Sequence, residues 1–170
     1  MFLEDAKCAV ILAHRRNAKV IINDRVDIAL LAGADGVHLG QEDLPPAEAR
    51  RLLGPSAIIG FSTHTLEQAE LAMLMPELDY IAVGPIFSTS TKADADPVVG
   101  LDLLKIVRKT VGSRPVVAIG GIKADTVAHV LHSGADSVAT IAELYRTGPD
   151  IAANFKRLTE IVETSGVKTP

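Results

Sequence analysis

Short apolar runs alternate with longer amphipathic segments along this chain. The runs do not alternate polar with apolar residues, and several are rich in Val and Ile. They cover residues 19–22, 36–39, 57–61, 80–83, 115–119 and 137–141. Runs of this kind are typical of strands that are buried on both faces of a parallel sheet. The pattern therefore predicts six parallel strands.

The longer segments place their apolar residues at helical spacing. The first of them, from residue 2 to about residue 16, precedes any strand. Four later apolar stripes are Val26, Ala29, Leu30 and Gly33; Leu101, Leu104, Ile106 and Val107; Val127, Val130 and Leu131; and Ile151, Phe155, Leu158 and Val162. Parallel strands joined through such helices have right-handed crossovers and helix-covered faces. The sequence thus predicts an α/β fold.

Composition narrows the class of protein. With 170 residues, 48% hydrophobic and 22% charged, the chain suits one soluble globular domain. Its net charge of −4 argues against nucleic acid as a partner. No uncharged apolar stretch reaches the roughly 18 residues of a membrane span, so we expect no membrane partner. The single cysteine, Cys8, suits a reducing compartment and is expected to be buried in the first helix. We expect a cytoplasmic protein.

Polar residues and glycines collect just after the predicted strands, where parallel α/β folds bind their ligands. In strand order they are Asn23 and Asp24; Gly40, Gln41 and Asp43; Ser62, Thr63 and His64; Thr89, Thr91 and Lys92; Gly120 and Gly121; and Ala142 and Glu143. An anionic substrate has to be held by such local groups, because the chain as a whole is acidic.

Two carboxylates, Asp24 and Asp43, follow neighbouring strands and could share a Mg²⁺ ion. Mg²⁺ is commonly held by one or two carboxylates together with waters and substrate phosphate oxygens. The alternative is helix capping, for which Asp is a favoured residue. For Asp24 alone the two interpretations are equal, and the pair on neighbouring strands favours the metal.

Three further features have a functional and a structural interpretation. The segment 89–92 offers hydroxyls, backbone amides and a lysine that suit a phosphate or diphosphate, but it also suits a solvated loop. The pair Gly120-Gly121 allows close approach of a ligand or simply makes a tight turn. His64 could act as an acid or base, although a structural hydrogen-bond role is favoured, and His38 inside a strand is expected to be a buried, hydrogen-bonded residue.

Five phrases of the sequence, in order and across nearly the whole chain, resemble the thiamine phosphate synthase family. They are residues 21–25 (IINDR), 33–45 (GADGVHLGQEDLP), 60–65 (GFSTHT), 84–87 with 89–92 (GPIF, TSTK) and 118–122 (AIGGI). The resemblance implies a TIM-type (β/α)₈ barrel. It also implies an enzyme that joins an aminopyrimidine methyl diphosphate to a thiazole phosphate, releasing pyrophosphate.

The resemblance also assigns roles to residues. Asp24 and Asp43 would bind Mg²⁺, and the catalytic residues would be Lys92 and Ser62. The residues that would contact the two small phosphorylated substrates are Asn23, Ser62, Thr89, Ser90, Thr91, Lys92, Gly121, Ile141 and Ala142. Chemistry of this kind needs positioning and electrostatic stabilisation rather than a protein nucleophile.

Two departures from the family pattern are expected to matter. Residues 1–170 are expected to form a single barrel-type domain truncated to about six strand–helix units, without the first strand, first helix and second strand. Open strand edges would then favour self-association, as a homo-oligomer or an aggregate, and an upstream extension would cure it. In addition, Ala142 stands where the family has a serine that binds phosphate.

Two other functions stay open from the sequence. The first is a thiazole tautomerase, a relative on the same barrel that would use His64 as acid and base without a metal. The second is a non-catalytic binder of phosphate ligands, which is suggested by the missing second strand and by Ala142.

Overall fold

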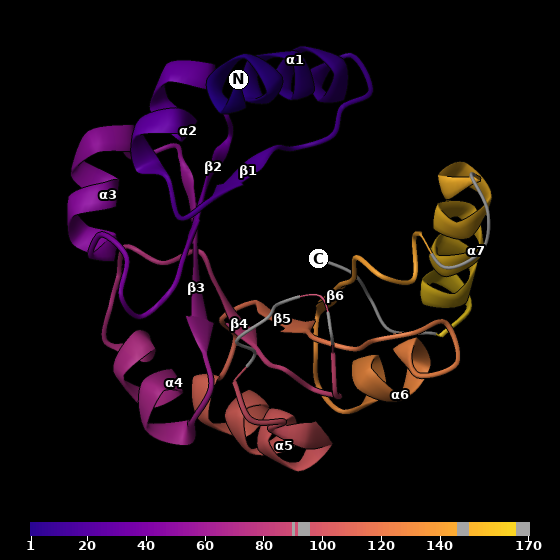
Figure 1. Ribbon diagram of the computed structural model, residues 1–170. Helices are drawn as coiled ribbons and strands as arrows, with labels where there is room; N and C mark the ends of the chain where they lie inside the picture. The colour runs from indigo at the N-terminus through magenta and orange to yellow at the C-terminus, as the bar shows by residue number, and fades with distance from the viewer. Residues whose placement is uncertain (90, 92–95, 146–149, 166–170) are drawn as a thin grey trace. The chain divides into compact units, whose positions relative to one another are not determined.

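The computed structural model describes residues 1–89, 91, 96–145 and 150–165, in which helices and strands alternate (Figure 1). The helices are α1 (Phe2–His14), α2 (Val26–Ala32), α3 (Pro46–Leu53), α4 (Leu66–Met73), α5 (Gly100–Val111), α6 (Val127–His132) and α7 (Ile151–Thr164). The strands are β1 (Ile21–Asn23), β2 (Gly36–Leu39), β3 (Ile58–Thr63), β4 (Tyr80–Val83), β5 (Val116–Ile119) and β6 (Ser137–Ala139).

All six predicted strands are present, and β2 and β4 have the predicted bounds. The last strand ends earlier than predicted, because the chain turns after Ala139. The amide of Leu144 donates to the carbonyl of Ile141 over 3.1 Å, which places Ile141 in a turn instead of in the strand. The predicted extension of this strand to Ile141 is therefore wrong.

Backbone contacts divide the chain into two compact units. The first comprises residues 1–62 and 74–80. In it β1, β2 and β3 pair in parallel, with Ile21 opposite Gly36 and Gly36 opposite Ile58. Helix α2 packs on β1 and β2, and helix α3 packs on β2 (Figure 1). The side chains of Val37, Leu39 and Ile59 in these strands are fully buried.

The second unit comprises residues 63–73 and those from residue 81 onward. In it β4, β5 and β6 pair in parallel, with Ile81 opposite Val116 and Val117 opposite Ser137. Helix α5 buries Leu104, Val107 and Val111. Thr63 is 1% exposed, and its hydroxyl donates to the carbonyl of Ala82 over 3.0 Å, so that this buried polar group is satisfied.

The apolar helix faces predicted from the sequence are buried only in part. Val127, Val130 and Leu131 are buried as predicted, but Leu30, Ile106 and Phe155 are 52%, 47% and 62% exposed. Cys8 is also exposed, against expectation. Its helix buries Ala6 and Val10, which lie four positions apart on one face, and Cys8 lies midway between them on the other side.

One arrangement recurs at the starts of the strands. An aspartate directly precedes each even-numbered strand: Asp35, Asp79 and Asp136. Each aspartate donates its own amide to a carbonyl at the start of the preceding odd-numbered strand, over 2.8 to 2.9 Å. Its carboxylate accepts the amide of that same partner residue over 2.7 to 2.8 Å. The partner residues are Val20, Ile59 and Val116.

A cation completes each of these clusters. Lys19, Arg50 and Arg108 form ion pairs with the three aspartates at 2.7 to 2.8 Å. The two arginines also donate to backbone carbonyls beyond their own helices. Arg50 reaches the carbonyls of Gly54, Pro55, Ala57 and Glu77, and Arg108 those of Gly112 and Arg114. Gly54 and Gly112 are the C-cap residues of α3 and α5, so carbonyls that these helix ends leave without a helical partner are bonded.

Replacing Arg50 with alanine should lower the free energy of unfolding by about 2–3 kcal/mol, because several charge-assisted hydrogen bonds are lost together. Arg51→Ala is the matched control, since Arg51 is 76% exposed and pairs with Glu48 in its own helix. It should cost less than about 1 kcal/mol. Urea unfolding followed by circular dichroism measures both values, and equal costs would contradict the role given to Arg50.

Asp35 should make stability depend on acid pH. Burial acts to raise the pKa of Asp35, but hydrogen bonds from Lys19, the Val20 amide and His14 outweigh it and hold that pKa well below its usual range. The stability that this carboxylate contributes is therefore present above about pH 5 and is lost as the pH falls through the ordinary value of about 3.9 and below.

In Asp35→Asn this part of the pH dependence should disappear. Unfolding measured between about pH 7 and pH 3 should show a destabilised variant at pH 7 whose deficit shrinks in acid. Asp102→Asn removes a carboxylate that is 94% exposed and serves as the control. A deficit that stays constant across this range would refute the assignment.

Candidate functional site

The carboxyl end of β1 presents two polar residues to solvent. Asn23 ends the strand and Asp24 follows it, and both residues are exposed. Asp24 has a φ of 63°, in the left-handed region that Asp tolerates better than most side chains. Its amide donates to the carbonyl of His38 over 2.8 Å, so this tight turn is fixed to β2.

Asp43 lies in the loop after β2 and is half-buried. Its Oδ2 accepts the amide of Gly40 over 2.6 Å, which closes the loop on itself. In the same loop Gln41 donates its side-chain amide to the carbonyl of Ser62 over 2.6 Å. The loop that carries Asp43 is thus tied to the end of β3.

Helix capping, the structural alternative for both aspartates, does not occur. The residue that caps α2 is Arg25 and the one that caps α3 is Pro45, and neither helix has a side-chain cap. Among the described residues no three His, Cys, Asp or Glu side chains come together as a metal cluster. The Asp24 and Asp43 pair remains the candidate for a hard cation that takes few protein ligands.

Ser62 takes part in a cluster with His38 and Tyr80. His38 Nε2 lies 2.9 Å from Ser62 Oγ, and His38 Nδ1 lies 3.0 Å from Tyr80 Oη. Burial lowers the pKa of His38 and the nearby Asp43 acts against that shift, while burial raises the pKa of Tyr80 to about 12. The predicted hydrogen bonding of His38 within the strand is confirmed, but the residue is half-buried instead of buried, and the contribution of Tyr80 was not predicted.

In the second unit, the segment after β4 runs beside the end of β5. The amides of Ile86 and Phe87 donate to the carbonyls of Ile119 and Gly120 over 2.9 and 3.0 Å. Gly121 has a φ of 63°, and a Cβ atom there would lie 2.5 Å from the carbonyl oxygen of Ser88. The need for glycine at this position comes from contact with the chain's own loop.

The predicted phosphate loop is described only in part. Thr89 Oγ1 accepts the amide of Thr91 over 3.2 Å, and the two hydroxyls are also 3.2 Å apart. These contacts bring the two threonine hydroxyls together. The predicted site residues Ser90 and Lys92 lie outside the described residues.

One ring nitrogen of His64 is hydrogen-bonded within the protein, and the other lies near a carboxylate. Its Nδ1 lies 2.6 Å from the carbonyl oxygen of Gly84, and its Nε2 lies 3.6 Å from a carboxylate oxygen of Asp96. Its backbone amide donates to the side chain of Gln68 over 2.7 Å. These contacts agree with the structural role that the sequence favours for His64.

After β6 the chain forms a polar turn. Thr140 donates its hydroxyl to the carbonyl of Ile122 over 3.0 Å, which ties this turn to the segment after β5. Ile141 and Ala142 are both exposed, in the loop instead of the strand. They remain at the carboxyl end of β6, where the sequence predicts phosphate contacts.

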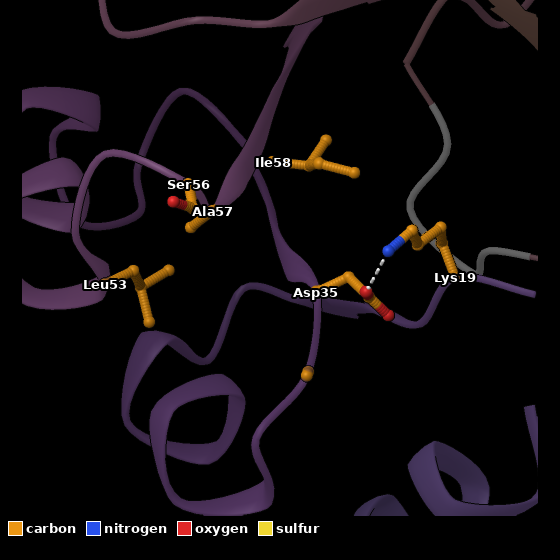
Figure 2. A pocket seen from close by; sticks show the side chains of 7 residues that line it. Lys19, Asp35, Leu53, Ser56, Ala57 and Ile58 are labelled. Atoms are coloured by element: carbon orange, nitrogen blue, oxygen red, sulfur yellow. Dashed lines mark hydrogen bonds and ion pairs between the residues drawn. The ribbon is translucent and has the colours of Figure 1, made fainter. Parts of the chain in front are cut away.

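Two pockets of the described structure lie away from these residues. One, of about 230 Å³, opens at the strand starts of the first unit, and Figure 2 shows its Lys19–Asp35 ion pair. The other, of about 370 Å³, is mainly apolar and lies between β6, α6 and α7. Neither pocket is lined by a predicted site residue. In the first pocket the Asp35 carboxylate already binds Lys19 and the amide of Val20.

Comparison with known proteins identifies close relatives. Residues 1–144 match the family model described as thiamine monophosphate synthase. The thiamine-phosphate synthase of Koribacter versatilis is 49% identical over 87% of this chain and 73% of its own length, and that of Azorhizobium caulinodans is 42% identical over 95% and 75%. The solved thiamine phosphate pyrophosphorylase from Pyrococcus furiosus has a TM-score of 0.84 and 36% identity, covering 96% of this chain and 77% of that one. The predicted TIM-barrel-type fold class is confirmed.

Gly121→Ala should disturb the loop after β4, because the new methyl group would meet the Ser88 and Phe87 carbonyl oxygens at 2.5 and 2.8 Å. Gly33→Ala is the matched control. Gly33 has a similar φ of 66°, but no atom lies within 4 Å of the position of a Cβ there. We expect Gly33→Ala to lose about 1–2 kcal/mol from backbone strain and Gly121→Ala to lose clearly more. Equal losses in thermal or urea unfolding would show that the clash is relieved at no cost.

Proposed function

Because this chain belongs to the thiamine monophosphate synthase family, we propose that it is a transferase that makes thiamine phosphate. The reaction joins an aminopyrimidine methyl diphosphate to a thiazole phosphate and releases pyrophosphate. The observation that supports this assignment best is the set of oxygen and nitrogen groups at the carboxyl ends of β1, β2 and β3. They are Asn23, Asp24, Asp43 and Ser62.

The carboxylates fit a Mg²⁺ ion by their chemistry. Asp24 is exposed and Asp43 half-buried, neither caps a helix, and both offer hard oxygen ligands after adjacent parallel strands. Mg²⁺ commonly takes one or two carboxylates and completes its shell with waters and phosphate oxygens. When bound, the ion would neutralise negative charge on the diphosphate. In this assignment Asp24 and Asp43 hold it.

Ser62 and Asn23 provide neutral polar groups near these carboxylates along the same strand ends. A serine hydroxyl can donate one hydrogen bond, and an asparagine amide can donate two. Both therefore suit the oxygens of a diphosphate without adding charge. Lys92, assigned by resemblance, would add the positive charge that a departing diphosphate requires.

By resemblance, residues that follow β4, β5 and β6 would hold the thiazole phosphate. The hydroxyls of Thr89 and Thr91 lie 3.2 Å apart, and the backbone of Gly121 lies close to Phe87 and Ser88 just before them. Ile141 and Ala142 follow β6, where Ala142 offers a backbone amide but no hydroxyl. Resemblance adds Ser90 to this phosphate site.

The chemistry needs no covalent intermediate with the protein. The bond between the pyrimidine methylene carbon and the diphosphate oxygen breaks, and its electron pair leaves with pyrophosphate. The thiazole nitrogen then donates its lone pair to that carbon and forms the new carbon–nitrogen bond. What the protein contributes is placement of the two reactants and stabilisation of the charge that develops on the leaving group.

The described structure favours this reaction over a thiazole tautomerase. A tautomerase would need His64 to exchange protons with a substrate. Nδ1 of His64 is instead hydrogen-bonded to the Gly84 carbonyl at 2.6 Å, and Nε2 lies 3.6 Å from the Asp96 carboxylate. We therefore assign His64 to holding the segment after β4.

The setting of the enzyme is a further part of the proposal. No helix in the described part of the chain is both long and apolar enough to cross a bilayer. The single cysteine suits a reducing compartment, and on that basis we propose the cytoplasm.

Asp24→Asn and Asp43→Asn should each lower kcat/KM for thiamine phosphate formation by a factor on the order of 10² or more, because a charge that supports the leaving group is lost. Asp27→Asn is the control, since Asp27 is a nearby carboxylate that pairs with Arg25 on the surface. It should stay close to the parent activity.

The assay uses both phosphorylated substrates, with Mg²⁺ or with EDTA. Activity is expected with Mg²⁺ and should be lost with EDTA. Absence of turnover with Mg²⁺, beside an active homologue, would refute the synthase. Turnover that survives EDTA and both Asn variants would refute the metal assignment alone.

A further inference from the structure

Ser62, His38 and Tyr80 form a hydrogen-bonded cluster, and Ser62 would not need the other two residues merely to contact a ligand. All three side chains are half-buried on one face of adjacent strands, and Ser62 lies two residues beyond Gly60, the register partner of His38. The imidazole is held between two hydroxyls, at 2.9 Å from Ser62 and 3.0 Å from Tyr80. Its ring also stacks on the ring of Tyr80, with centroids 5.5 Å apart.

Gly60 makes room for this stack. A Cβ atom at Gly60 would overlap the hydroxyl end of the Tyr80 ring. The tyrosine ring therefore lies across the strand where a side chain is missing, and in this way reaches His38 on the next strand. This crossing fixes the position of the imidazole, and with it the position of its hydrogen bond with Ser62.

The hydrogen bonds that join the two hydroxyls through His38 can run in either of two directions. In a neutral imidazole one ring nitrogen donates and the other accepts. If Nε2 carries the proton, it donates to Ser62 Oγ and leaves the serine proton free for a ligand. If Nδ1 carries the proton, Nε2 instead accepts the serine proton, and Ser62 then presents lone pairs, which an anion repels.

We propose that Tyr80 and His38 are a positioning pair that orients the Ser62 hydroxyl as a hydrogen-bond donor to the bound diphosphate. Tyr80 donates to Nδ1, which places the imidazole proton on Nε2. Nε2–H donates to Ser62 Oγ, and Ser62 Oγ–H points to a diphosphate oxygen. This inference rests on the proposed function, because it takes the diphosphate as the ligand of Ser62.

This relay of hydrogen bonds, from Tyr80 through His38 to Ser62, has a direction that can be measured without substrate. Nitrogen-15 NMR of the histidines, above about pH 8 where imidazole is neutral, distinguishes protonated from unprotonated ring nitrogens. His38, assigned through a His38→Gln sample, should carry its proton on Nε2 in the parent protein. In Tyr80→Phe the Nδ1–H form should become populated, because the donor to Nδ1 is gone while the stacking ring remains. A parent protein with the proton on Nδ1 would overturn the proposal, even if Tyr80→Phe failed to fold.

Binding tests the consequence for the ligand. Calorimetry with inorganic pyrophosphate and Mg²⁺ should show about tenfold weaker binding to Tyr80→Phe, the size expected for losing one well-placed hydrogen bond to a charged group. In a Ser62→Ala background the same tyrosine change should have little further effect, since the pair acts through Ser62. Tyr145→Phe is the control, because Tyr145 is the other tyrosine of the chain and is 65% exposed.

In the steady state, Tyr80→Phe should raise the KM for the diphosphate substrate more than it lowers kcat. An additive effect of Tyr80→Phe and Ser62→Ala would overturn the relay, as would unchanged pyrophosphate binding. An active enzyme with the Nδ1 proton refutes the relay alone. An inactive protein that keeps the Nε2 proton and the serine-dependent pyrophosphate binding refutes the synthase alone.

Discussion

The two-sided hydrogen bonding of an aspartate to the start of the preceding strand aligns three strand starts of this structure with their neighbours. Asp35, Asp79 and Asp136 each bind one partner residue through both backbone amide and carboxylate. A slip of one residue would break both bonds and would also turn every side chain of the strand to the opposite face. The alignment of the strand starts therefore decides which residues lie side by side at the carboxyl ends of the strands. The carbonyl of Asp35 also accepts the amide of Ile58, which joins β3 to the start of β2. In that pairing His38 lies opposite Gly60, and Ser62 lies within hydrogen-bond reach of His38.

The two faces of the first unit's strands divide stability and chemistry between them. Val37, Leu39 and Ile59 are fully buried and pack under the helices, while their neighbours His38, Ser62 and Tyr80 are only half-buried. Side chains of a strand alternate between the two faces of the sheet. In β2, for example, Val37 and Leu39 belong to the core, and His38 between them belongs to the site. Changes on the packed face are expected to alter stability before they alter chemistry.

Much of this architecture follows from local sequence. Continuous apolar runs located all six strands, and β2 and β4 were located to the residue. The positions of Asn23, Asp24, Asp43 and Ser62 at strand ends follow from the same pattern. Helix faces were less predictable: in the seven-residue helix α2, Ile28 is buried and Leu30 is not, because neighbouring elements decide which arc is covered. The end of β6 was also missed, since the turn after Ala139 depends on bonds to other loops.

The role of Tyr80 could not be read from its own surroundings, because it opens an ordinary apolar strand. Its ring lies over a residue twenty positions earlier that has no side chain, and contact across that gap is a property of the folded chain. Substitutions at Gly60 and at Tyr80 therefore depend on each other. A larger residue at position 60 is tolerated only if the aromatic ring at position 80 is given up, and in relatives of this chain the two positions should vary together.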